Sequence, residues 1–173
     1  MAVGNLEFIK SASGTSVSEL SVTDCFSDKY DVYAISLKDF YQTGTSTRNM
    51  YIRFISSAGT RTGANYDFAN LALTSFQSFG ELKNTNQTAI QSWFYDVDLD
   101  EEGAGGIFYI HNPYDSSTYT FLQGQSVSYN NGNGGQGTKG IGVYKVAEEI
   151  TGINFTISGD SIEGIAVSVY GVK

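Results

Sequence analysis

Apolar and polar residues alternate along most of the chain, which is the pattern of half-buried β-strands. In the segment 49–56, Met50, Ile52 and Phe54 fall on one side of an extended chain. The same alternation recurs in 153–157 and in 165–169. All segments for which we predict a strand are 17–22, 30–40, 49–56, 93–99, 106–111, 119–128, 141–147, 153–157 and 165–169. Short strands at this spacing are typical of sandwiches and barrels.

The segments between the predicted strands carry turn-forming residues, such as Ser13-Gly14 and Gly105-Gly106. The segment 70–79 has some helical character and predicts a short connecting helix. The glycine-rich run 130–140 lies between two predicted strands, so we interpret it as a long hairpin loop and not as a linker between domains. The sequence therefore predicts one all-β domain over 1–173, an antiparallel β-sandwich of jelly-roll type with at most one short helix.

The composition agrees with short strands better than with long helices. Charged residues make up 16% of the chain, well below the roughly 25% of an average soluble domain. The chain has 12 Tyr and 11 Phe, and aromatic side chains fit pleated, half-buried surfaces. A length of 173 residues is enough for one real core.

The net charge of −8 argues against nucleic acid as a partner, because a phosphate backbone would repel such a field. Cys25 is the only cysteine, so an internal disulfide is not possible. The residues 1–10 show no basic start followed by an apolar run, and no stretch of the sequence is long enough to span a membrane. We expect synthesis in the cytoplasm, no membrane partner, and assembly into something larger.

The densest group of charges is the acidic run 96–102. Alternation would place Asp96, Asp98 and Asp100 on one strand face, where their oxygens could hold Ca²⁺. The helix-loop-helix calcium motif is excluded, because Glu101 stands where that motif needs glycine and Ile107 where it needs glutamate. The alternative is a solvated strand end that runs into a charged turn. Apart from this possible Ca²⁺, no cofactor is expected.

Catalytic groups are few. His111 is the only histidine and is expected to hydrogen-bond in a turn at a strand end. Cys25 would need a base beside it to act as a nucleophile, and nothing in the sequence brings His111 to it. We therefore predict that the protein is not an enzyme.

Four tyrosines in or near predicted loops are candidates for contact with a ligand or a partner. They are Tyr41, Tyr114, Tyr119 and Tyr129. Aromatic rings at such places can stack on a sugar, but on a β-sandwich they are more often part of the core or of a subunit interface. Both interpretations stay open.

Two stretches of the sequence resemble a known class of proteins. The first is the opening, with Leu6-Glu7-Phe8-Ile9-Lys10, Ser16-Val17-Ser18-Glu19-Leu20 and Tyr30-Asp31-Val32-Tyr33. The second is the ending, with Gly140-Ile141-Gly142-Val143-Tyr144, Gly152-Ile153-Asn154-Phe155 and the final segment 167–173. In these stretches the chain resembles small β-sandwich virion proteins of marine tailed bacteriophages, including those that infect cyanobacteria.

The resemblance implies a structural role and no catalytic residues. Such proteins are tail-associated, fibre-like or capsid-decorating. We accordingly expect a virion protein that is made in the host cytoplasm, docks on the capsid or tail, and contacts other virion proteins or further copies of itself. The alternative is a carbohydrate-binding or receptor-binding module that mediates host attachment through a surface glycan or receptor.

Overall fold

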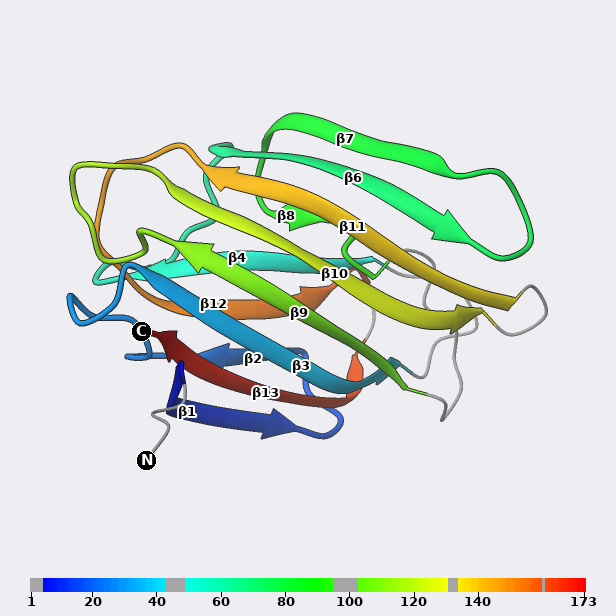
Figure 1. Cartoon of the computed structure of the whole chain (residues 1–173), viewed down its shortest axis with the longest axis horizontal. Coiled ribbons are helices and arrows are strands. Elements are labelled where there is room, and N and C mark those ends of the chain that lie inside the picture. The colour runs from blue at the N-terminus through cyan, green and yellow to red at the C-terminus, as the bar shows by residue number, and fades with distance from the viewer. Residues whose placement is uncertain (1–4, 43–48, 95–102, 131–133, 160) are drawn as a thin grey trace.

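Two antiparallel β-sheets form the computed structural model, which describes residues 5–42, 49–94, 103–130, 134–159 and 161–173 (Figure 1). In spatial order, the large sheet contains β1 (Leu6–Gly14), β13 (Ile162–Val172), β3 (Val32–Gln42), β9 (Ala104–His111), β10 (Thr120–Asn130), β11 (Gly134–Tyr144), β6 (Tyr66–Thr74) and β7 (Gly80–Gln87). The small sheet contains β2 (Glu19–Val22), β12 (Ile150–Ile157), β4 (Met50–Ser56) and β5 (Gly59–Thr60), with β8 (Ile90–Gln91) paired to β4.

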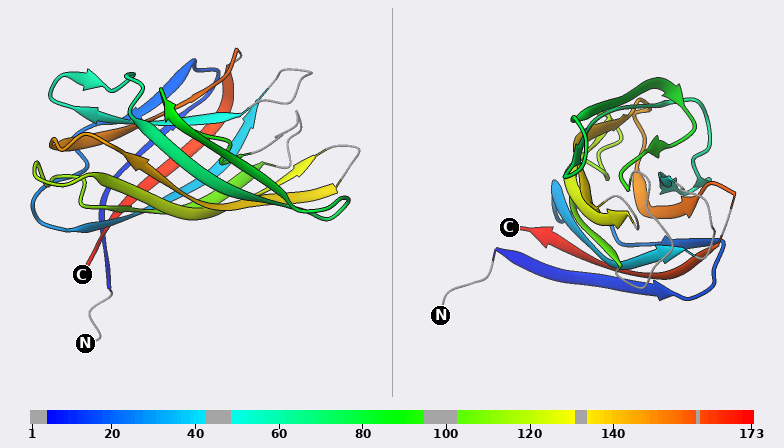
Figure 2. Two further views of the ribbon diagram at one scale, coloured as in Figure 1. Left: turned by 90° about the horizontal axis from the view of Figure 1, so that it is seen from above. Right: turned by 90° about the vertical axis from the view of Figure 1, so that its right-hand side faces the viewer.

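The chain passes from one sheet to the other many times, because strands that follow each other in sequence often belong to different sheets. The large sheet curls around the small one, so that a single core lies between them (Figure 2). This arrangement is the predicted all-β antiparallel sandwich.

Alternation along each strand decides which side chains fill that core. From the small sheet, Met50, Ile52 and Phe54 are fully buried, as the period of two predicts. The large sheet contributes Phe108 and Ile110 from β9 in the same way, together with apolar residues of β3 and β13. The sequence-based assignment of strands at 49–56, 153–157 and 165–169 is therefore confirmed.

The predicted helix at 70–79 is wrong. The first half of this segment belongs to β6, which lies between β11 and β7, and none of the described residues is helical. Asn70 and Ala72 point inward in register with Tyr66 and Phe68, so the segment continues a strand alternation that the sequence pattern alone left ambiguous.

The predicted long glycine-rich loop at 130–140 is also wrong over most of its length. Gly134 already pairs with Asn130 at the end of the β10–β11 hairpin, and residues 134–140 belong to β11. These glycines belong to a strand and permit close contact between neighbouring strands of the sheet. Gly137 shows this, because a Cβ there would collide with the carbonyl oxygen of Ser126 on β10.

The predicted strand at 93–99 lies largely outside the described residues. Trp93 and Phe94 are buried in the core but are not part of a strand. Within the described ranges, no helix has the length and hydrophobicity that a membrane span requires.

Candidate functional site

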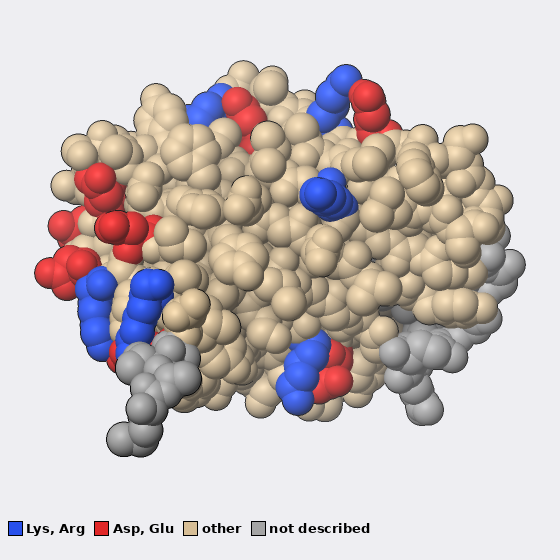
Figure 3. All heavy atoms as spheres, viewed as in Figure 1, with Lys and Arg blue, Asp and Glu red and all other residues tan. Residues whose placement is uncertain are grey.

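The large sheet has an outer face, turned away from the small sheet, that carries exposed apolar side chains over β9, β10, β11 and β6. We call the following seven residues the apolar face: Ile107, Tyr109, Phe121, Val127, Tyr129, Ile141 and Leu71. Val127 and Ile141 are the most exposed of them, at 65% and 59%. In Figure 3 the middle of this face is almost free of charged groups, and most of those in view lie toward its margins.

Strand register builds the apolar face. Tyr109 on β9 is paired with Gln123 on β10, and Gln123 is paired in turn with Ile141 on β11. The neighbouring row consists of Ile107, Gln125 and Lys139. Phe108 lies between these rows on β9 and is buried, and so are Ile110 and Leu122, the pair on the other side of the first row. The outward direction of each row therefore follows from the pleat.

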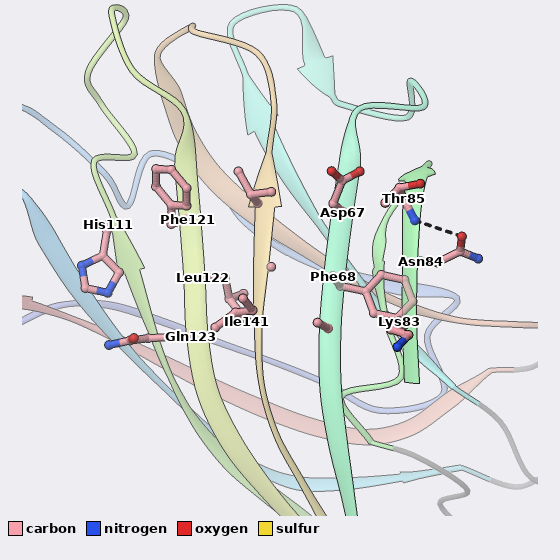
Figure 4. A pocket seen from close by; sticks show the side chains of 13 residues that line it. Asp67, Phe68, Lys83, Asn84, Thr85, His111, Phe121, Leu122, Gln123 and Ile141 are labelled. Carbon is pink, nitrogen blue, oxygen red and sulfur yellow. Dashed lines mark hydrogen bonds between the residues drawn. The ribbon is translucent and has the colours of Figure 1, made fainter. Parts of the chain in front are cut away.

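A groove of about 700 Å³ crosses one part of the outer face (Figure 4). Phe121 and His111, which are cross-strand partners on β10 and β9, line one side of the groove. Ile141 and Ala69 line its middle, and Lys83, Asn84 and Thr85 line the side formed by β7. Apolar groups predominate in the middle of the groove and at the side of Phe121, and polar groups predominate at the side formed by β7.

The rim of the groove is held by ion pairing. The carboxylate of Asp67 lies 2.8 Å from the ammonium of Lys145 and also accepts a hydrogen bond from the backbone N–H of Asn86. These two contacts, with Lys145 the larger, lower the pKa of Asp67 below its ordinary value. Both side chains of the pair are less than one-third exposed, which fixes β6 against the segment that follows β11.

Lys139 differs from the other cations of the protein. It lies on β11 between two shallow hollows, one lined with Ile107, Tyr109 and Gln125 and the other with Leu71 and Glu81. The remaining described Lys and Arg residues all form an ion pair or a hydrogen bond, namely Lys10, Lys29, Lys38, Arg53, Arg61, Lys83, Lys145 and Lys173. Among the residues that the structure describes, Lys139 is the one cation with no such contact.

The four tyrosines predicted as contact residues do not form one cluster. Tyr119 and Tyr129 are each about half exposed but flank opposite ends of β10. Tyr41 is half-buried on β3, with its ring over Gly164 of β13. Tyr114 is half-buried in the β9–β10 connection. Their role as contacts stays a prediction, and only Tyr129 belongs to the apolar face.

Sequence reasoning missed the centre of the apolar face. Tyr109 and Phe121 occupy outward positions of strands that were predicted, but the inward residues next to them include the apolar Phe108, Ile110 and Leu122. When both sides of a strand are apolar, alternation does not tell which side faces water. A signal was present in the runs Ile107-Phe108-Tyr109-Ile110 and Phe121-Leu122, in which consecutive apolar residues fall on both sides of an extended strand.

The structure does not bring Cys25 and His111 together as a nucleophile and a base. Cys25 is buried in the core, where its thiol donates a hydrogen bond to the carbonyl oxygen of Val22 at 3.2 Å. Burial raises the pKa of this thiol to about 12. His111 instead lines the groove on the outer face.

The predicted calcium ligands Asp96, Asp98 and Asp100 lie outside the described residues, so the calcium site stays a prediction. Within the described ranges, no three His, Cys, Asp or Glu side chains gather in a way that would hold a metal ion.

Comparison with known proteins leaves the chain without a family. No protein-family model matches it, and no curated protein sequence matches it. Among solved structures, it is similar to the marine PL-14 alginate lyase from Aplysia kurodai, with a TM-score of 0.34 and 7% sequence identity over 86% of this chain and 72% of the lyase. A similarity of this size carries no argument about function.

Proposed function

We propose that the chain is a non-enzymatic virion protein of a tailed bacteriophage, which docks through its outer face onto a neighbouring subunit of the capsid or tail. The observation that carries the docking role is the apolar face itself. Soluble monomers rarely expose a large contiguous apolar patch, and such patches mark sites of protein–protein contact. The virion assignment rests on the resemblance of the opening and closing stretches to tailed-phage virion proteins.

The distribution of charge also favours a protein partner. Charged residues are depleted at the cores of protein interfaces and gather at the rim. On the outer face, the ion pairs Lys38–Asp39, Lys83–Glu81 and Lys145–Asp67 lie on strands that flank the apolar face or at its margin. The aliphatic members of the face, such as Val127 and Ile141, suit burial against another apolar surface.

Docking can be tested with variants of two exposed residues of the face. We expect Phe121→Ser and Ile141→Ser to fold normally, because each side chain is about half exposed or more. In combination they should weaken co-sedimentation with purified capsids or tails about tenfold or more, as the loss of central interface side chains does. Phe79→Ser is the matched control, because Phe79 is equally apolar and exposed but lies in the β6–β7 turn, outside the apolar face. Unchanged co-sedimentation of the double variant would contradict the proposal.

One observation favours a second candidate function, the binding of a host glycan. The groove places the ring of Phe121 and the imidazole of His111 opposite the polar side chains of Asn84 and Thr85 (Figure 4). An apolar floor with a few polar groups suits a small ligand, and the volume is in the range of ligand sites. A glycan array probed with the native chain and with Phe121→Ser separates the two functions. A specific signal that this variant loses, without binding to capsids or tails, selects the second.

A further inference from the structure

A shallow hollow of about 420 Å³ lies on the outer face beside the groove. Six outward side chains from three neighbouring strands form its walls, namely Ile107 and Tyr109 on β9, Gln123 and Gln125 on β10, and Lys139 and Ile141 on β11. Among the described residues, neither of the two amide groups nor the ammonium of Lys139 has a hydrogen-bond or ion-pair partner. Three polar groups that are held by a sheet and left unpaired can bind a ligand.

Strand pairing sets the size of the hollow. Its two outer walls stand on β9 and β11, which lie two strand spacings or roughly 10 Å apart. Gly124 and Gly140 pair with each other between the two rows of side chains, so that backbone forms part of the floor. The resulting span is comparable to the length of a disaccharide.

The groups around the hollow match the chemistry of a sugar that carries an acid group. The exposed ring of Tyr109 offers apolar surface to the C–H groups of a sugar ring, and the amides of Gln123 and Gln125 can both donate and accept hydrogen bonds. The ammonium of Lys139 only donates, and its strongest partners are anionic oxygens. Lysine is depleted at the cores of protein interfaces, so its central place here favours a ligand of this kind over a protein.

The charges near the hollow leave Lys139 free for an anionic group. Glu81 and Lys83, which line the hollow on the other side of Lys139, form an ion pair at 2.7 Å. At the groove, Asp67 is paired with Lys145. Each carboxylate on the described strands β6, β7, β9, β10 and β11 thus has a lysine of its own, and Lys139 is the surplus cation in a chain with a net charge of −8. An anion is therefore attracted here and repelled by most of the remaining surface.

We propose that this hollow binds an acidic saccharide, in which a carboxylate or sulfate group pairs with Lys139 and hydroxyl groups bond to Gln123 and Gln125. The inference rests on the second candidate function, glycan binding at the outer face, and names the class of glycan. Gln123 and Ile141 also line the groove, so a longer saccharide continues from the hollow into the groove.

The first test is a glycan array that presents uronic acid oligosaccharides beside their methyl esters, and sulfated oligosaccharides beside their desulfated forms. We expect the native chain to bind the charged member of at least one pair and to give a signal at least tenfold weaker with its neutral form. The two kinds of pair distinguish a carboxylate from a sulfate ligand. Equal signals from charged and neutral forms would overturn the inference alone. The absence of any signal would overturn it together with the second candidate function.

The second test measures the affinity for the selected saccharide by calorimetry. Lys139→Gln should weaken binding at least tenfold, because it removes the charge and keeps most of the side chain. Lys38→Gln is the control, since it removes the same charge at an exposed lysine on β3 that already has an acidic neighbour, and it should bind like the native chain. Native affinity of Lys139→Gln would contradict the inference.

Co-sedimentation of the same two variants with capsids or tails tests the docking proposal separately. We expect Lys139→Gln to co-sediment as the native chain does, because the apolar side chains that carry docking are unchanged. Weaker co-sedimentation of this variant, without a glycan signal from the native chain, would assign the hollow to a protein partner and overturn the inference.

Discussion

Gly124 and Gly140 face each other across the β10–β11 pair, and neither position has room for a Cβ. A Cβ on Gly140 would lie 2.6 Å from the carbonyl oxygen of Ala69 and would also collide with the side chain of Asn70. A Cβ on Gly124 would collide with the carbonyl oxygen of Ile107 and lie 2.9 Å from the Cα of Phe108. β10 therefore lies close to β9, and β11 close to β6, because these positions are glycine.

Substitution of either glycine should destabilise the fold. We expect Gly140→Ala and Gly124→Ala each to lower the free energy of unfolding by about 1–3 kcal/mol, because the obstructing atoms include backbone that must shift. Gly80→Ala on β7 is the control, since its Cβ would meet only Ala72 at an ordinary 3.9 Å. Urea titrations followed by circular dichroism measure the difference. Equal midpoints for Gly140→Ala and Gly80→Ala would show that the sheet relaxes freely at this place.

Glu7 makes the stability of the fold depend on pH. Its carboxylate accepts hydrogen bonds from Lys29 and Tyr30 and lies 3.2 Å from the ammonium of Lys173. These contacts lower the pKa of Glu7 from 4.5 to about 2. Because the pKa of Glu7 is lower in the folded than in the unfolded chain, its ionised form stabilises the fold above pH 4.5. This contribution is lost as the pH falls toward 2. Glu7→Gln should therefore lower the Tm modestly at pH 7 and have no effect near pH 2.

The control for this pH dependence is Glu81→Gln, because Glu81 pairs with Lys83 where both side chains are at least 70% exposed. Exposed pairs contribute little, so its Tm should follow that of the native chain. Thermal scans between pH 2 and pH 7 measure both variants. A Tm difference for Glu7→Gln that does not change with pH would mean that the residue acts through packing and not through its charge.

Cys25 should be unreactive in the folded protein. Its thiol is buried and its pKa is raised to about 12, so almost no thiolate is present at pH 8. We expect an aromatic disulfide reagent to label Cys25 only at the rate of unfolding, and at once in guanidinium chloride. Rapid labelling under native conditions would indicate that the β2–β3 connection opens locally.

Tyr66 links the two sheets through its hydroxyl group. The hydroxyl accepts a hydrogen bond from the backbone N–H of Phe54 at 3.1 Å and donates one to the carbonyl oxygen of Arg61 at 3.0 Å. Burial raises the pKa of Tyr66, so the group stays neutral. Tyr66→Phe leaves a buried N–H of the small sheet without this acceptor and should cost about 1–3 kcal/mol in chemical denaturation. Tyr109→Phe on the outer face should change stability by less than about 0.5 kcal/mol.

The sequence was sufficient to predict the sandwich but not its surface. Met50, Ile52 and Phe54 were predicted to share one side of a strand, and the residues between them, Tyr51 and Arg53, are more polar. Tyr109 gave no such contrast, since Phe108 and Ile110 flank it in the chain, and Phe121 gave a misleading one, since the polar Thr120 beside it is buried. The exposure of Tyr109 and Phe121 depends on the register in which β9, β10 and β11 pair. The local alternation of apolar and polar residues does not predict that register.

The two errors in the predicted elements have a similar cause. Glycine is the commonest residue of tight turns, and the run 130–140 was interpreted in that sense. In the structure Gly137 lies close against Ser126 of β10, and Gly140 lies close against Ala69 of β6, a strand that is distant in the sequence. The segment 70–79 was assigned to a helix because of its local composition. In the structure, pairing of β6 with β11 and β7 outweighs this local preference.

The two outer strands of the large sheet limit how copies of the chain can join. On β1 the pairing shifts between Phe8 and Lys10, and on the β7 side it shifts between Tyr66 and Phe68, next to Asn86 with a φ of 55°. Irregular, charged margins such as these resist the addition of a further strand. A continuous sheet running from one molecule into the next is therefore disfavoured at both ends. Copies of the chain that assemble would therefore have to join through the faces of their sheets, as discrete folded units and not as cross-β fibres.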